Sequence, residues 1–353
     1  MTAAGLSPAY RLRLGNKVVD TSREPKASTL VALDLVLDLD VPADAFTLAL
    51  GAVGSFRPAK DDVAEISLGY KGEDAEKVIS GAVVAVETGL TEIRVSGKSA
   101  ASKLLRTFLD RTFEGMNAGD IVRELCTAGG VEVARAEDGT DFPAYVIDSR
   151  RSAWHHLRDL ADFSGFDLWI DRDGKLVFER FAGGRIAHVL EFKKHLLALD
   201  VVRREPGAAR VEAWGESPAS ARGEETWGWL THDFSGARGT QGEGDPLRRL
   251  ERPVLRTRQA AQTAATALWR KIQRNGLTGR ALTLGRPQVR LGDSIRLRGL
   301  ADESLNTFFQ VRRVRHRLTK AGGFTTEIGF RSIEIPGDPA TSVSGGSGGG
   351  GAP

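Results

Sequence analysis

The region between residues 257 and 335 constrains the fold most, because helix, turn and strand patterns follow one another there in a fixed order. Alanines spaced for one helical face run to a stop at Asn275-Gly276. Gly285-Arg286-Pro287 and Leu291-Gly292-Asp293-Ser294 then mark the turns that open a strand. A long strand through Val311-Arg312-Arg313-Val314 and a reversal at Gly322-Gly323 follow. These pieces specify a structural barrel, and none of them carries a reaction.

The first 98 residues predict a compact antiparallel barrel. Leucines at 33, 35, 37 and 39 alternate with Asp34, Asp38 and Asp40, which is the period of a half-buried strand. We expect these carboxylates to share a solvated face, because a calcium loop of the EF-hand type would need a glycine and a distal glutamate that this stretch lacks. Further strands are predicted at 46–50, 64–70, 78–87 and 91–96.

Residues 99–187 predict a small α/β domain inserted between β-rich regions. Leu104, Leu105, Phe108 and Leu109 form one apolar stripe with helical spacing. A second helix starts at Asn117 and stops at Gly129-Gly130, and a third runs from Ser152 to Ser164-Gly165. Asp173-Gly174 between two apolar runs predicts a hairpin.

Residues 188–337 predict a second barrel. Strands are expected at 189–192, 198–202 and 211–214, followed by a long polar loop at 215–250 and a helix at 257–275. The glycine- and serine-rich tail at 338–353 is expected to be disordered.

Composition and charge favour an ordinary globular protein. The chain has 353 residues with 41% hydrophobic and 27% charged, and no apolar run approaches the roughly 18 residues of a membrane span. Residues 1–15 lack the apolar core of a secretory signal, so synthesis and folding in the cytoplasm are expected. The pI is about 9.0, yet 49 basic residues face 46 acidic ones. We expect the late basic residues to form a solvated or intersubunit face in preference to a DNA contact; they are Arg290, Arg296, Arg298, Arg312, Arg313, Arg315 and Arg317.

Segments that resemble enzyme motifs lack the residue spacing or the structural context that those motifs require. Ser96-Gly97-Lys98-Ser99 resembles the end of a phosphate-binding loop, but Glu92 stands where that loop needs its first glycine. Gly239, Gly242 and Gly244 lie in the predicted long loop, whereas dinucleotide binding requires a strand before and a helix after such glycines. We predict no catalytic residue and no cofactor.

The histidines and the cysteine predict no metal site. His155 and His156 are neighbours on a predicted helix and point about 100° apart, so one should pack and the other should face water. His316 lies between basic residues, which disfavour a cation nearby. Cys126 is the only cysteine, which excludes a disulfide within the chain, and we expect it to be a small buried apolar residue.

The order of these motifs resembles the late control protein D family, the hub proteins of contractile phage tails and related injection machines. The resemblance begins with residues 7–20 and continues through Glu92–Gly97, Gly119–Val122 and Trp154–Trp169 to the region described first. It covers roughly residues 7–335. Each motif alone is common, whereas their order and spacing together are specific.

The resemblance implies a homotrimeric baseplate hub, similar to the hub part of the VgrG spikes of type VI secretion. In such hubs two barrels per subunit are similar to tail-tube subunits, so three chains match a sixfold tube to a threefold spike and line the central channel. The implied partners are two more copies of the chain, the tail tube protein, other baseplate proteins and a separate spike, since this chain ends soon after Ile335. The protein would be a component of an assembled phage tail or injection particle, with nucleic acid or an effector only as transported cargo.

Two other classes of protein stay open. A tail-tip peptidoglycan hydrolase needs paired carboxylates whose separation is a property of three dimensions. A nucleic-acid-binding tail component would lose affinity steeply with salt. The sequence is equally compatible with a phage, a pyocin-like particle and an extracellular injection system.

Overall fold

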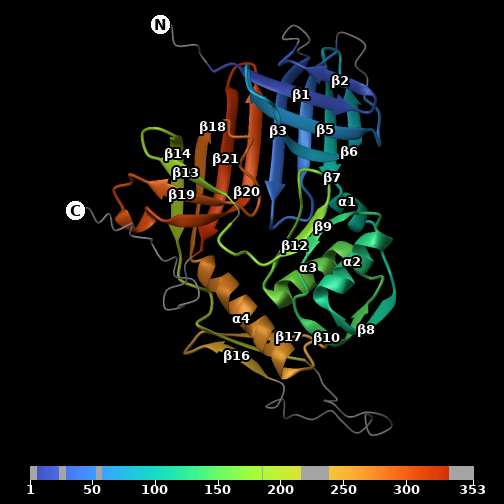
Figure 1. Ribbon diagram of the computed structural model, residues 1–353, viewed down its shortest axis with the longest axis vertical. Helices are drawn as coiled ribbons and strands as arrows, with labels where there is room; N and C mark the ends of the chain where they lie inside the picture. Colours follow the sequence, from blue (N-terminus) through green and yellow to red (C-terminus); the bar gives the residue numbers. More distant parts are fainter. Residues whose placement is uncertain (1–5, 24–28, 53–57, 185, 216–237, 334–353) are drawn as a thin grey trace, which may run out of the picture.

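The computed structural model describes residues 6–23, 29–52, 58–184, 186–215 and 238–333. This part of the chain forms a β-rich α+β fold, in which a large curled sheet stands above a lobe of helices and small sheets (Figure 1). The predicted disordered tail at 338–353 and residues 216–237 of the predicted long loop lie outside the described residues.

The N-terminal strands confirm the predicted period of two. Leu33 and Leu35 are fully buried, and the strands predicted at 46–50, 64–70, 78–87 and 91–96 are all present. The strands are β1 (Pro8–Leu14), β2 (Lys17–Asp20), β3 (Leu30–Asp38), β4 (Ala45–Gly51), β5 (Val63–Tyr70), β6 (Glu76–Thr88) and β7 (Glu92–Ser99).

The C-terminal strands contain the long strand and the reversal that the sequence predicts. β20 spans twelve residues, and Gly323, at φ +69°, reverses the chain into β21. The strands are β13 (Ala187–Glu191), β14 (Leu196–Arg203), β18 (Leu277–Leu284), β19 (Ser294–Arg298), β20 (Phe308–Thr319) and β21 (Gly323–Ser332), with a 3-10 helix at Glu303–Leu305.

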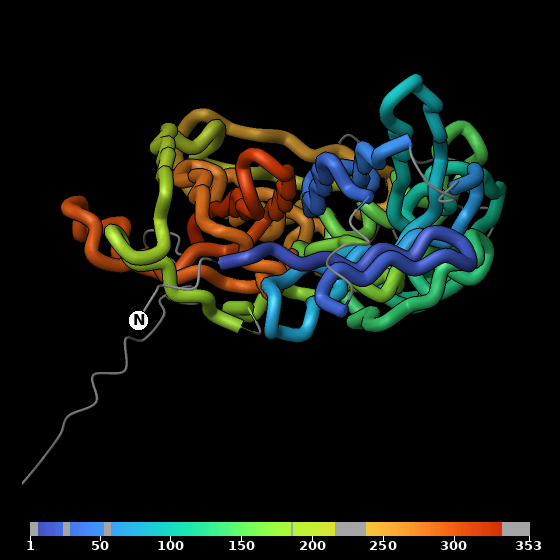
Figure 2. The backbone as a smooth tube through the Cα atoms, turned by 90° about the horizontal axis from the view of Figure 1, so that it is seen from above, coloured from blue at the N-terminus to red at the C-terminus, as the bar shows by residue number. Residues whose placement is uncertain are grey.

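Both groups of strands belong to one continuous sheet. Its order among the described residues is β14-β18-β21-β20-β3-β4-β7-β6-β5-β1-β2, with β13 and β19 branching from β20. All neighbours are antiparallel except β13 and β19. The two halves meet where β20 pairs with β3, and Figure 2 shows them side by side, blue and cyan on one side and orange and red on the other.

Among the described residues, the lobe below the sheet combines four helices with three small sheets. The helices are α1 (Ala101–Leu104), α2 (Ala118–Ala128), α3 (Ala153–Ser164) and α4 (Arg258–Arg274). The strands are β8 (Arg111–Asn117), β9 (Val133–Ala136), β10 (Asp141–Ile147), β11 (Asp167–Ile170), β12 (Leu176–Glu179), β15 (Arg210–Trp214), β16 (Gly239–Gly242) and β17 (Leu247–Glu251). No helix in the described ranges has the length and apolar character needed to cross a bilayer.

Side-chain and glycine caps define the ends of the longer helices. The side chain of Asn117 accepts a hydrogen bond from the Asp120 amide at 2.8 Å, and Thr257 caps α4 through the Ala260 amide at 3.1 Å. Gly165 ends α3 in the left-handed region at φ +69°, which favours glycine. Ser152 is the N-cap residue of α3, but its hydroxyl contacts the His155 ring instead of the helix backbone.

Two predictions about local structure are wrong. The apolar stripe from Leu104 to Leu109 is not a long helix, because α1 ends at Leu104 and Phe108 is half exposed. Residues 239–251 are not loop, because β16 and β17 flank β15 and complete a three-stranded sheet. Both misreadings have one cause: a short segment takes its structure from the neighbours it packs against.

Three clusters of buried side chains form the core. One lies mainly in the N-terminal strands, a second lies mainly in the C-terminal strands together with Trp169 and Val177 of the lobe, and the third fills the lobe. The alanine face of α4 belongs to the lobe cluster, where Ala260, Ala261, Ala264 and Ala265 are buried. Leu37 packs against both sheet clusters, at the strand that joins the two halves.

Candidate functional site at the junction of sheet and lobe

A β-bulge on β20 sets the geometry of the junction. Val311 pairs with Phe330 and Arg313 pairs with Gly329 on β21, so Arg312 is an extra residue between them. The Leu39 amide donates a hydrogen bond to the Arg312 carbonyl at 2.9 Å. Because the bulge breaks the alternation of the strand, the Arg312 side chain is buried beside a core residue instead of facing water.

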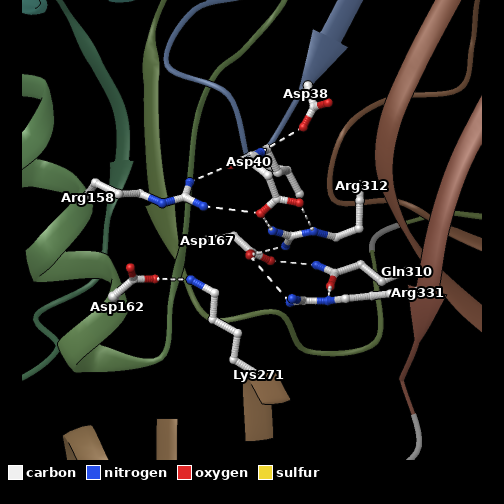
Figure 3. A network of polar contacts seen from close by, with 10 residues as sticks. Asp38, Asp40, Arg158, Asp162, Asp167, Lys271, Gln310, Arg312 and Arg331 are labelled. Atoms are coloured by element: carbon white, nitrogen blue, oxygen red, sulfur yellow. Dashed lines mark hydrogen bonds and ion pairs between the residues drawn. The ribbon is translucent and has the colours of Figure 1, made fainter. Parts of the chain in front are cut away.

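Arg312 lies between two carboxylates from distant parts of the chain. Its guanidinium donates to Asp40, just beyond β3, and to Asp167, the first residue of β11 (Figure 3). Arg158 of α3 reaches the same region, donating to the Leu39 carbonyl and pairing with Asp40 at 3.2 Å. Asp40 and Arg312 thus tie the sheet to both α3 and β11 of the lobe.

Asp167 has further polar contacts besides the one with Arg312. The side-chain amide of Gln310 donates a hydrogen bond to the Oδ2 atom of Asp167. The Nε atom of Arg331 donates to the side-chain oxygen of Gln310 at 3.0 Å. The Arg331 guanidinium also lies 3.8 Å from Asp167. Burial alone would raise the pKa of Asp167, but the charges of Arg312 and Arg331 and the donated hydrogen bonds outweigh burial and lower the pKa to about 2.

The surroundings shift the pKa values of Arg331 and Arg312 in opposite directions. Burial and the neighbouring Arg312 charge lower the pKa of Arg331 to about 10, although Asp167 opposes the shift. Burial also disfavours the charge of Arg312, but Asp167 and Asp40 raise its pKa above the ordinary value. The positive charge of Arg312 is therefore well compensated. Arg331 shares its carboxylate partner, Asp167, with Arg312, which pairs with that carboxylate more closely.

A second row of ion pairs runs along the joint between β3 and β20. Arg315 donates from Nε to Asp34 at 2.8 Å, and Arg313 lies 3.8 Å from Asp38. The Arg315 hydrogen bond lowers the pKa of Asp34, while burial raises the pKa of Asp38. The sequence predicts that these residues lie on solvated faces, but they are only partly exposed, because pairing of the two strands brings the acidic row against the basic row.

The junction borders a cavity of about 480 Å³ between α3, α4, β11 and the β20–β21 pair. Lys271 of α4 pairs with Asp162 of α3 at its rim, at 2.8 Å (Figure 3). Asp162 and Asp167 are the acidic residues among the described side chains of the lining. The basic ones are Arg158, Arg180, Arg270, Lys271, Arg274, Arg312 and Arg331.

A smaller cavity of about 270 Å³ lies between the two halves of the sheet and β11. His316 and Asp44, both buried, contribute to its wall. The Nδ1 atom of His316 contacts the Thr326 hydroxyl at 2.9 Å, and its Nε2 atom has no hydrogen-bond partner among the described residues. Burial lowers the pKa of His316 to about 3 and raises that of Asp44 to about 7.

The residues weighed for chemistry in the sequence do not converge. The segment 96–99 lies within β7, and Gly239 and Gly242 lie in β16, so neither set forms a phosphate-binding turn before a helix. His156 is buried and His155 is exposed, which confirms the prediction for this pair. Cys126 is fully buried in the lobe core, as predicted. Across the described residues no group of three or more histidine, cysteine, aspartate or glutamate side chains is placed to hold a metal ion.

The sequence contains a pattern that predicts part of this junction. Acidic residues at 34, 38 and 40 and basic residues at 313, 315 and 317 are both spaced two or four apart on strands. Complementary rows of this kind favour cross-strand pairing. The bulge at Arg312 and the contribution of Asp167 follow from tertiary packing and leave no comparable pattern.

Known structures share the whole fold. The 43 kDa tail protein of prophage MuSo2 from Shewanella oneidensis matches with a TM-score of 0.68 at 14% identity, over 92% of this chain and 98% of that chain. A tail protein from Neisseria meningitidis matches with a TM-score of 0.69 at 14% identity, over 93% and 98%. A type VI secretion system component from E. coli matches with a TM-score of 0.58 at 10% identity, over 93% and 77%.

No protein-family profile matches the sequence, and no curated protein is similar to it in sequence. The structural matches nevertheless span nearly the whole chain. The fold is that of phage tail proteins and of a type VI secretion component, which agrees with the resemblance drawn from the sequence motifs.

Proposed function

We propose that this chain is a structural baseplate hub, which adapts a sixfold tail tube to a threefold spike and lines the central channel. The observation that carries the proposal is the continuous curled sheet, in which two groups of strands meet at the β3–β20 joint. Two tube-like units in one subunit would allow three subunits to present six of them. The likeness to tail proteins over more than nine-tenths of the chain supports the same role.

The proposal includes a division into parts. Residues 1–98 form a first tube-like barrel, residues 99–187 an inserted α/β domain, and residues 188–337 a second tube-like barrel. The three core clusters support three parts. Within the last range, α4 and β15 pack into the same core as the insert, so the lobe also draws on residues that follow it in sequence.

The charged junction fits a mechanical role better than a catalytic one. Arginines hold both Asp167 and Asp40, and Gln310 also donates to Asp167, whose pKa of about 2 makes it a poor proton acceptor at neutral pH. Ion pairs that join the sheet to α3 and β11 fix the lobe relative to the sheet. A hub that transmits force between tube and spike requires such a joint.

The edge of the sheet at β14 supports a contact between subunits. β14 pairs with β18 on one side, and no other described strand pairs with it. Large apolar side chains are exposed on β14 and on its neighbour β18, which is unfavourable in an isolated chain; they are Leu197, Val202 and Leu284. A ring closed by copies of the chain would cover them.

Light scattering tests this proposal on the purified protein, alone and mixed with the spike encoded in its gene neighbourhood. The expected particle has three times the 38.0 kDa mass of the chain. A monomer or a dimer under both conditions would refute the hub proposal.

A further inference from the structure

We propose that the cavity between α3, α4 and β11 is a binding site for a phosphate-class oxyanion. The inference goes beyond the hub role and does not depend on it. The cavity volume of about 480 Å³ lies within the usual range for small-molecule sites, roughly 300–1,000 Å³.

The charge of the lining selects an anion. Seven basic side chains and two acidic ones line the cavity among the described residues. Asp40, which pairs with Arg158 and Arg312 from beside the cavity, is a third carboxylate at the site, and the basic side chains still outnumber the acidic ones. Excess positive charge in a concave, partly desolvated site attracts and concentrates anions.

The basic side chains lie at different depths in the cavity. The side chains of Arg312 and Arg331 are 8% and 10% exposed and form the deep end, whereas those of Arg158 and Lys271 are 24% and 35% exposed. Arg331 is the buried cation that its neighbours compensate least, because Asp167 lies closer to Arg312. An oxyanion entering from the rim would meet guanidinium groups along its whole path.

The donor types favour phosphate over a carboxylate or a metal ion. One guanidinium group can bind two phosphate oxygens through two parallel hydrogen bonds, and the lysine ammonium group adds a compact positive charge. Thr263 of α4 also lines the cavity and supplies a hydroxyl group of the kind that binds phosphate oxygens. A free phosphate compound and a nucleic acid backbone present the same chemical group, and the experiment must separate these two sources.

Calorimetric titration of the full chain with pyrophosphate, at constant ionic strength, tests the site. Replacing rim cations by Arg180→Gln or Lys271→Gln should weaken binding roughly threefold to tenfold each. Asp162→Asn removes the carboxylate that pairs with Lys271 and should tighten binding, which a purely structural role would not cause. Arg280→Gln is the matched control, because Arg280 is exposed on β18 and does not line the cavity.

Saturable binding that follows this order of variants supports the site. Absence of saturation up to about 10 mM pyrophosphate, or equal losses in Arg280→Gln and Lys271→Gln, would overturn it. A single-stranded oligonucleotide then distinguishes the sources. If it displaces pyrophosphate, the site takes backbone phosphate; if pyrophosphate stays bound, the site takes a free anion.

Discussion

Arg312 illustrates how one inserted residue converts a surface strand into a joint. In an ordinary ladder successive side chains of β20 would point to opposite faces of the sheet, so Arg312 would face away from the side on which Val311 is buried. With the bulge, it lies between Asp40 and Asp167, and its charge is compensated in a buried place. A buried ion pair of this kind adds little net stability, but losing one partner is costly.

Replacing Asp167 should be severely destabilising. Asp167→Asn leaves Arg312 with one carboxylate and Arg331 with none among the neighbours described, so the free energy of unfolding should fall by about 3–5 kcal/mol. Asp162→Asn is the matched control, because its pair with Lys271 is partly exposed and should be worth less than about 1 kcal/mol. Urea denaturation at pH 7 compares the two variants. Equal losses would show that the junction does not depend on this carboxylate.

Asp44 should make stability depend on pH. Burial raises its pKa to about 7, with a smaller contribution from Asp38, whereas the unfolded chain has the ordinary value near 4. Between these two values the folded state binds the proton more tightly, so stability falls as pH rises from about 4 to about 7. Asp44→Asn keeps an acceptor for the Asp38 amide and cannot ionise.

The Asp44→Asn variant should therefore be more stable than the parent at pH 8, by at most on the order of 4 kcal/mol. At pH 4 the difference should nearly vanish. Urea denaturation across this range measures it, with Asp74→Asn on the surface as the control. The same difference at pH 4 and pH 8 would rule out ionisation of Asp44 as its source.

At the scale of single elements, close packing between strands depends on residues whose role is not evident from the sequence. Gly97, part of the segment that resembled a phosphate loop, lies in β7 opposite Phe46 of β4. A Cβ atom at this position would lie 2.0 Å from the Phe46 ring, which is itself buried. The glycine is thus needed for packing, and its place in the motif is coincidental.

Gly97→Ala should lower the free energy of unfolding by roughly 1–3 kcal/mol, because the Phe46 ring must move within a filled core. Gly207→Ala is the matched control, since a Cβ there meets nothing within 4 Å and its backbone is not in the left-handed region. Thermal and urea denaturation of both variants provide the comparison. If Gly97→Ala were neutral, the core around Phe46 would have to be looser than the structure indicates.

At the scale of the whole molecule, the exposed edge at β14 is the place where the proposed assembly is most vulnerable. Leu197 is the extra residue of a bulge between Leu196 and Ala198, and more than half of its side chain is exposed. Leu197→Lys should therefore leave the fold intact and weaken the trimer, because a charge would be buried in the contact. Leu90→Lys, at a fully exposed turn, is the control.

Light scattering over a dilution series measures the effect of the two lysine variants. Dissociation of Leu197→Lys at concentrations where Leu90→Lys stays trimeric is the expected outcome. Two variants with the same mass at every dilution would place the contact elsewhere on the molecule.

The sequence by itself determined the local structure. The alternation around Leu33 and Leu35, the helix starts at Asn117 and Thr257, and the stop at Gly165 predict strands and helices correctly, because each depends on neighbours a few residues away. It also identified Cys126 as a buried apolar residue and predicted that one of the adjacent histidines His155 and His156 is buried.

Only the tertiary structure decided which strands and faces meet. Backbone hydrogen bonding is the same for every strand, so nothing local pairs β3 with β20 across some 280 residues or assigns the alanine face of α4 to the lobe core. The bulge that buries Arg312 arises only once β21, Asp40 and Asp167 surround it. The cavity and its excess of positive charge follow from that arrangement, because a concave site exists only where separate elements come together.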